Sequence, residues 1–401
     1  MATTTNVTTA TAPGTGATEA SNTICVDTQH DDMVHDAQLD YYGCKLATSS
    51  SDRTVKIYDV SNNSYTPTAT LQGNHTGPVW SLSWSHPKFG SLLASASFDG
   101  SILVHREVRP GEWVVVYGNS TNSTTSSFRH HHRQANNMNT SSNDNTTTPA
   151  LHESSVNDVQ FAPHEYGLTL AGASSDGKVS VLTHGQDDNW LVEYIHDNAL
   201  GVNSISWAPY TAYESSGANG GDGSGNQNGN DEDDNGFIRG EENKEGDGSN
   251  LSSSMRLVTG GCDNKIRFWM KAPNANTWVE DTTNQPIAST SVFHSDWIRD
   301  VAWAPSIIPN TNIVASCSED RNVIIWTQKG GLGNEWVGKV LHTFEDPVWR
   351  LSWSVTGNIL AVSSGDSSVT LWKQNIHENW VQVSSVAENV GSNGTDGTGN
   401  Q

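Results

Sequence analysis

Histidine and aspartate, which combine in acid–base and metal sites, recur at regular intervals along this 401-residue chain. A histidine precedes an apolar segment by four residues in four places and by six in a fifth (His30, His75, His152 and His294, then His196). An aspartate follows a short Ala-, Ser- and Gly-rich segment in six places (Asp52, Asp99, Asp176, Asp263, Asp320 and Asp366). A catalytic pair would occur once and break the repeat. His–Asp pairs that occur in copy after copy of the repeat indicate a structural role.

Two other groups resemble metal ligands. His130, His131 and His132 are adjacent in a polar segment, and the acidic run DEDD begins at Asp231. Adjacent histidines in a polar loop lack fixed geometry, and the acidic run lacks the spacing and closing glutamate of a calcium loop. The four cysteines show neither metal-ligand spacing nor a paired framework. We therefore predict no metal, no cofactor and no enzyme activity.

The elements that carry the histidines and aspartates form a repeat. Its clearest copy spans 294–326, with one strand after the histidine, a second before the aspartate and a third ending on Trp326. The first strand recurs at 34–39, 79–84, 156–161, 202–207, 298–303 and 348–353. Without low-complexity insertions at 118–150 and 211–253 the period is about 45 to 50 residues, which is typical of a four-stranded propeller blade.

The fold class predicted is all-β: a six-bladed β-propeller over residues 23–386. Residues 1–22 and 387–401 have the composition of disordered tails. Residues 23–27 (TICVD) are expected to form an isolated strand.

Ring closure follows from counting strands. Blades 1 and 6 each have a fourth strand of their own, at 66–71 and 380–386, so nothing supplies a shared closing strand. We therefore expect an open ring whose facing apolar blades are covered by a partner. Residues 23–27 either join a donated blade or lie across the gap. The seam residues predicted are Val34, Ala37, Leu39, Trp380, Val381 and Val383.

The repeat resembles the WD-repeat family. That resemblance implies a buried chain of hydrogen bonds through the histidine, a strand serine, the turn aspartate and a terminal tryptophan. The tryptophan is present as Trp269, Trp326 and Trp372 and is missing from blades 2 and 3.

The segments HDAQLDYYGCKLATSSSDRTVKIYDV, GGCDNKIRFW, HSDWIRDVAWAPS and PVWRLSWSVTGNILAVSSGDSSVTLWK are similar to the Sec-thirteen family. The resemblance implies a scaffold subunit of the COPII outer coat in ER-to-Golgi transport and of the nuclear pore complex. It implies a partner-donated seventh blade, from a Sec-thirty-one-like coat protein or a helical nucleoporin of the Y complex. It also implies a cytoplasmic protein, peripheral on the endoplasmic reticulum membrane and present at the nuclear pore. The alternative is a Seh-one-like nucleoporin adaptor.

Charge and hydropathy limit the remaining functions. The formal net charge is −23, which disfavours binding to nucleic-acid phosphates or to an anionic membrane surface. No apolar run approaches 18 residues, so we expect no membrane insertion.

Overall fold

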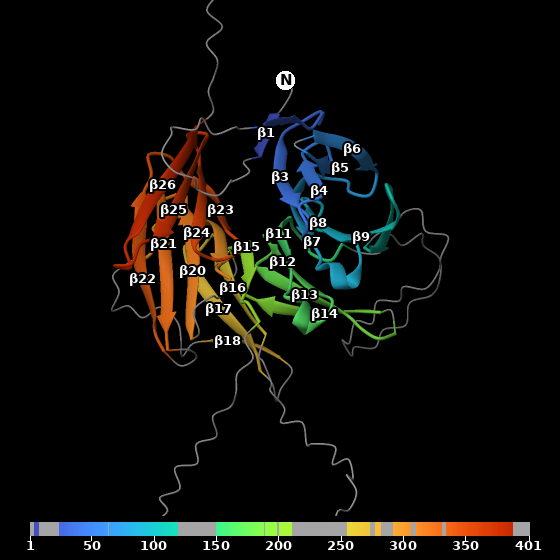
Figure 1. Ribbon diagram of the computed structural model, residues 1–401. Helices are drawn as coiled ribbons and strands as arrows, with labels where there is room; N and C mark the ends of the chain where they lie inside the picture. Colours follow the sequence, from blue (N-terminus) through green and yellow to red (C-terminus); the bar gives the residue numbers. More distant parts are fainter. Residues whose placement is uncertain are drawn as a thin grey trace, which may run out of the picture.

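Six four-stranded antiparallel sheets are arranged around a central axis in the computed structural model (Figure 1). The structure describes residues 4–7, 24–62, 64–118, 150–187, 189–198, 200–210, 255–272, 277–281, 292–305, 310–330 and 334–387. Each sheet is one blade built from consecutive strands, so the predicted six-bladed propeller is confirmed.

The strands run outward from the axis in chain order within each blade. Blades 1 to 3 comprise β3 Val34–Leu39, β4 Lys45–Ser50, β5 Val55–Ser61, β6 Ser64–Leu71; β7 Val79–Trp84, β8 Leu92–Ser97, β9 Ile102–Arg109, β10 Glu112–Tyr117; β11 Val156–Phe161, β12 Thr169–Ser174, β13 Lys178–His184, β14 Trp190–His196. Blades 4 to 6 comprise β15 Val202–Trp207, β16 Arg256–Gly261, β17 Ile266–Lys271, β18 Trp278–Glu280; β19 Ile298–Trp303, β20 Thr311–Ser318, β21 Asn322–Lys329, β22 Trp336–Thr343; β23 Val348–Trp353, β24 Ile359–Ser364, β25 Ser368–Gln374, β26 Trp380–Ala387. Two 3₁₀ turns, η1 Pro87–Phe89 and η2 His164–Tyr166, follow β7 and β11.

The second strand of each blade is rich in Ala, Ser and Gly because neighbouring blades approach closely there. Every residue of β8 and of β12 is buried. A Cβ added at Gly172 of β12 would lie 2.3 Å from a methyl carbon of Ile102 in blade 2. Small side chains at these positions therefore let one wedge-shaped blade lie against the next.

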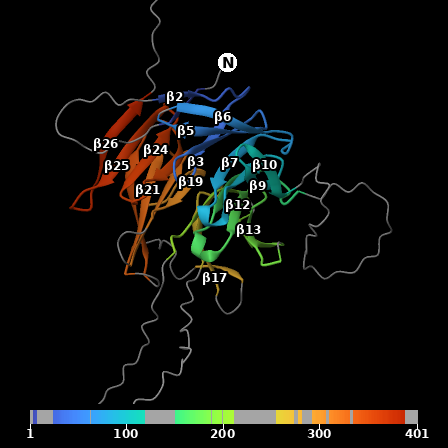
Figure 2. The same ribbon diagram turned by 45° about the vertical axis from the view of Figure 1, so that its right-hand side comes forward.

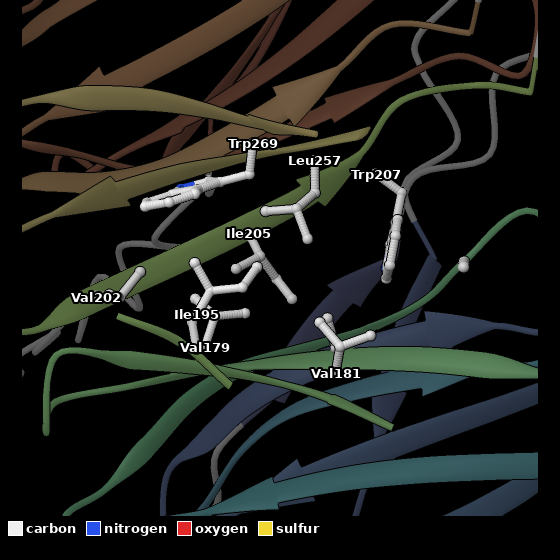
Figure 3. Close-up of a cluster of buried hydrophobic side chains, with 11 residues drawn as sticks. Val179, Val181, Ile195, Val202, Ile205, Trp207, Leu257 and Trp269 are labelled. Carbon is white, nitrogen blue, oxygen red and sulfur yellow. The ribbon is translucent and has the colours of Figure 1, made fainter. Parts of the chain in front are cut away.

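The buried apolar side chains of the described residues form five clusters, and each cluster joins two consecutive blades. Figure 3 shows the cluster between blades 3 and 4, where Val179 and Val181 face Ile205 and Leu257. The other clusters join blades 1 and 2, 2 and 3, 4 and 5, and 5 and 6. None of the five joins blade 6 to blade 1.

The amino-terminal segment forms a small sheet of its own. Strand β1 Thr4–Val7 pairs with β2 Ile24–Asp27, and both lie at the end of the molecule near blades 1 and 6 (Figures 1 and 2). A strand within residues 1–22 differs from the disordered tail predicted from composition. The other residues of that tail lie outside the described residues, as do nearly all of 387–401 and of the two insertions, with His130–His132 and the acidic run.

Equivalent valines at a closed junction and at the seam should differ in stability cost. Val79 is fully buried between blades 1 and 2, whereas its equivalent Val34 is only half-buried. We expect Val79→Ala to lower the free energy of unfolding by about 2 kcal/mol, because it leaves a cavity. Val34→Ala should cost about 1 kcal/mol or less, since its surroundings are already open. Urea unfolding of both variants measures the difference, and equal costs would contradict an open seam.

Candidate functional site at the seam between two blades

In blades 1 to 5, the third residue of the inner strand forms a hydrogen bond to the following blade. A β-bulge after the first residue shifts the register of all six inner strands at this point. In blades 1, 3 and 5 the third residue is an aspartate, whose carboxylate accepts a hydrogen bond from a backbone N–H of the next inner strand. The pairs are Asp36 with Leu82 at 2.8 Å, Asp158 with Ile205 at 3.0 Å and Asp300 with Leu351 at 2.7 Å.

Serine takes the same position in blades 2 and 4. The hydroxyl of Ser81 accepts the N–H of Val159 at 3.3 Å, and that of Ser204 accepts the N–H of Val301 at 3.3 Å. Ser81 also donates to Asp158 at 2.8 Å, and Ser204 donates to Asp300 at 2.7 Å. A polar bond of this kind, the inner-strand bond, therefore crosses each of the first five junctions.

Blade 6 has Arg350 at this position. Arginine carries only donors, so it cannot accept the N–H of Ala37 in blade 1. That N–H donates to the carboxylate of Asp36, its own neighbour in sequence, at 2.8 Å, as the N–H of Val159 also does to Asp158 at 2.9 Å. The inner-strand bond is therefore missing between blades 6 and 1, a junction that we call the seam.

Apolar packing is looser at the seam too. Ala315, Cys317, Val323 and Ile325 of blade 5 face blade 6 and are at most 3% exposed. The equivalent residues of blade 6 are all partly exposed: Ala361, Ser363, Val369 and Leu371. On the other side, Val34 is half-buried, while the first residues of the other five inner strands are 0% exposed.

A cavity of about 350 Å³ opens at the seam. It is lined entirely by blades 1 and 6: Val34, His35, Asp36, Ala37, Arg350, Leu351, Ser352, Ala361, Ser363 and Val369. Its walls come from the facing strands of the two blades and combine apolar side chains with the polar groups of His35, Asp36 and Arg350.

The inner end of the cavity is strongly charged. Burial alone would lower the pKa of Arg350, but the carboxylates of Asp36, Asp300 and Asp158 raise it above its usual range. Burial, helped by Asp158, raises the pKa of Asp300 to about 6 against the opposing effect of Arg350. Burial also raises the pKa of Asp36. Arg350 thus supplies the cation for acids drawn from three other blades.

Histidine and aspartate are paired in four blades. In blade 5, His294 Nδ1 lies 3.0 Å from Asp320 and Nε2 lies 2.8 Å from the hydroxyl of Ser316, to which the indole N–H of Trp326 donates at 2.9 Å. The other pairs are His30 with Asp52 at 2.7 Å, His75 with Asp99 at 3.4 Å and His152 with Asp176 at 3.0 Å. Although burial opposes it, hydrogen bonding to His294 lowers the pKa of Asp320 to about 2.

The assignment of His196 is wrong. His196 ends strand β14 and is exposed, and the next residue, Asp197, takes the buried position. The carboxylate of Asp197 bonds the hydroxyl of Thr259 and accepts the indole N–H of Trp269 at 3.2 Å. Arg267 then pairs with Asp197 at 3.0 Å and also with Asp263. An acid and an arginine thus replace the imidazole in blade 4.

Blade 6 lacks this chain. Asp366 is exposed at its turn, and the indole of Trp372 donates to Thr370 at 2.9 Å. Phe344, at the histidine position, packs against Trp372. In blade 2, where the tryptophan is absent, the buried His105 bonds Ser95 at 3.3 Å.

The predicted seam residues divide into two groups. Val34 and Ala37 line the cavity, whereas Leu39, Val381 and Val383 are 40 to 51% exposed and lie outside its lining. Trp380 packs against Trp353 in the cluster between blades 5 and 6, so its assignment to the seam is wrong. The series of inner-strand bonds, which begins with Asp36 and stops at Arg350, was not predicted. The third residue of each inner strand, which is visible in the sequence, was the available signal.

Blade 6 contains only its own four strands, and β2 pairs with β1 in a separate sheet. Neither strand of that sheet extends blade 6 or blade 1.

Comparison with known proteins agrees with this geometry. The family model described as WD domain, G-beta repeat matches residues 22–59, 65–106, 286–327 and 338–373. "Protein SEC13 homolog" of Drosophila melanogaster is 40% identical over 360 residues, covering 89% of this chain and 82% of the relative. "Protein transport protein sec13" of Emericella nidulans is 38% identical over 373 residues, covering 90% and 96%.

The chain belongs to the Sec13 family. Its resemblance to that family, carried by the repeat segments, is confirmed. A chain in a solved structure titled "Crystal Structure of Mitotic Checkpoint Complex" has a TM-score of 0.56 and 17% identity, and covers 89% of this chain and 79% of its own length. That likeness supports the propeller fold alone.

The described residues of this Sec13 family member contain no group of three or more His, Cys, Asp or Glu side chains placed to hold a metal ion. None of their helical segments has the length and apolar character needed to span a bilayer.

The blade 5 chain should contribute measurably to stability. We expect Asp320→Asn to lower the free energy of unfolding by about 2 kcal/mol, because a buried carboxylate that bonds His294 is lost. Asp366→Asn is the matched control at the same turn of blade 6, where the aspartate is exposed, and should cost less than about 0.5 kcal/mol. Urea unfolding at neutral pH compares the two variants. Equal losses would show that the chain adds nothing beyond the turn.

Asp300 should make stability fall as the pH rises. Its pKa is raised from 3.8 to about 6, so the folded chain binds this proton more tightly than the unfolded chain does. Its contribution is therefore fully present below about pH 4 and is lost as the pH rises through about 6. Relative to Asp300→Asn, the wild type should lose on the order of 2–3 kcal/mol between pH 4 and 7. Urea unfolding across this range tests it, and a constant difference would refute the raised pKa.

Proposed function

We propose that this Sec13 family protein is a scaffold subunit that binds a helical-solenoid partner by taking strands of that partner into the seam. The observation that carries the proposal is that the described residues of the six blades form five apolar clusters between blades, with a cavity at the remaining junction. Strand addition supplies backbone hydrogen bonds for affinity and side-chain pockets for specificity.

The transport role rests on the relatives, which are named as protein transport proteins. In the proposed role the chain forms part of the COPII outer coat in ER-to-Golgi transport, bound to a Sec-thirty-one-like protein. A second site of action is the nuclear pore complex, where the partner is a helical nucleoporin of the Y complex. The protein would act in the cytoplasm, peripherally on the endoplasmic reticulum membrane, and at the pore.

The proposed role is mechanical and needs no catalysis. Each buried histidine that meets an aspartate is held by two or more hydrogen bonds, and the arrangement recurs in four blades. An added blade would cover the half-exposed faces of blades 1 and 6 and make the ring continuous. A continuous ring is stiffer, which suits a subunit that rigidifies a rod-like partner.

Binding through the seam predicts a position-specific effect of a new charge. We expect Val369→Glu, which puts a carboxylate on a cavity-lining face, to weaken binding of a Sec-thirty-one-like segment at least about tenfold. Val114→Glu is the matched control, since Val114 is 41% exposed on β10 of blade 2. The measurement is calorimetric titration of the purified chain with a segment that contains both the donor strands and the solenoid.

Two results would contradict the proposal. One is equal binding by wild type, Val369→Glu and Val114→Glu. The other is binding of neither the Sec-thirty-one-like segment nor a helical nucleoporin. Binding of the nucleoporin alone would instead favour the Seh-one-like adaptor role.

A further inference from the structure

In blades 1 to 5, the side chain of the second residue of the inner strand also contacts the following blade. Five such contacts cross the five closed junctions. They are His35 with Trp80, ring centres 4.3 Å apart; Trp80 Nε1 to Ser155 Oγ, 3.0 Å; Asn157 Nδ2 to the Val202 carbonyl, 2.9 Å; Asn203 Nδ2 to the Ile298 carbonyl, 2.8 Å; and the Arg299 guanidinium over Trp349, 4.9 Å from the ring centre.

Trp349 is the second residue of the inner strand of blade 6, so its position in this series faces the seam. It is 45% exposed, whereas the other five second residues are partly buried by the blade that follows them. Its indole nonetheless packs against the preceding blade and lies close to the backbone of Gly365. Arg299 stacks against it, and its Nε1 lies 3.4 Å from the position that a Cβ on Gly365 would occupy. A large apolar ring that is fixed before binding loses little entropy when a partner covers it.

We infer that Trp349 is the anchor on blade 6 for the inner strand of the inserted blade. This inference rests on the proposed function and names a residue of that same site. Trp80 gives the precedent within the chain, because its indole N–H donates to Ser155, the residue immediately before the first residue of the next inner strand. The partner that fits therefore offers a hydroxyl or carbonyl oxygen just before the first apolar residue of its inner strand. Buried tryptophans of this kind often dominate the affinity of an interface.

Substitution of Trp349 tests the inference. We expect Trp349→Ala to weaken binding of the Sec-thirty-one-like segment about 30-fold or more. Trp349→Phe, which keeps an aromatic face but loses the N–H donor, should show an intermediate loss. Phe98→Ala is the matched control, because Phe98 is a 59% exposed aromatic residue on blade 2 and should leave the affinity unchanged. All three variants should keep the wild-type urea midpoint.

A second readout reports on the indole itself. In protein labelled with 5-fluorotryptophan, the fluorine resonance that disappears in Trp349→Phe belongs to Trp349. It should shift when the segment is added. Wild-type affinity in Trp349→Ala, or an unshifted resonance in the saturated complex, would overturn the inference.

Binding measurements separate the role of Trp349 from the proposed function. If Val369→Glu weakens binding while Trp349→Ala does not, the seam binds the partner and the role of Trp349 is wrong. If the wild-type chain binds no solenoid partner at all, the proposed function fails and the anchor role fails with it.

Discussion

An arginine cannot accept a hydrogen bond, and this limit decides where the propeller ring is interrupted. At five junctions an aspartate or a serine on one inner strand accepts a backbone N–H of the next. Around the ring the third residues read Asp, Ser, Asp, Ser, Asp and then Arg350. The series of inner-strand bonds therefore runs from blade 1 to blade 6 and stops there. The N–H of Ala37 donates to Asp36 in its own strand.

The apolar layer ends at the same junction as the polar one. A blade buries two faces, and a blade at the end of an open series leaves one of them partly uncovered. Blade 6 shows this directly, because its face toward blade 5 carries Leu360 and Val362, which are fully buried, while its opposite face carries the partly exposed Val369 and Leu371. The polar and the apolar observations are independent of each other, and both place the interruption of the ring between the first and last blades. The exposed side chain of Trp349 is a further sign that no blade follows blade 6 in this chain.

Features contained in one repeat could be predicted from the sequence. The strands, the turns and four His–Asp pairs each lie within one stretch of about 25 residues, so spacing alone brings them together. The assignment of His196 was wrong because this residue ends the outer strand of blade 3. The next residue, Asp197, takes the inward position and pairs with Arg267. The assignment of Trp380 to the seam was wrong because counting strands does not determine which face of a strand packs against which blade. The role of Arg350 could not be predicted, because its carboxylate neighbours come from three other repeats and meet only in the folded propeller.

Hydrogen–deuterium exchange on the two sides of the seam tests the account most directly. In the isolated chain, β3 and β24 should exchange faster than their equivalents β7 and β20, which lie at closed junctions. Addition of the Sec-thirty-one-like segment should slow exchange in β3 and β24 and leave β7 and β20 unchanged. Equal protection of all four strands in the isolated chain, unaltered by the segment, would contradict the claim that a partner completes the ring.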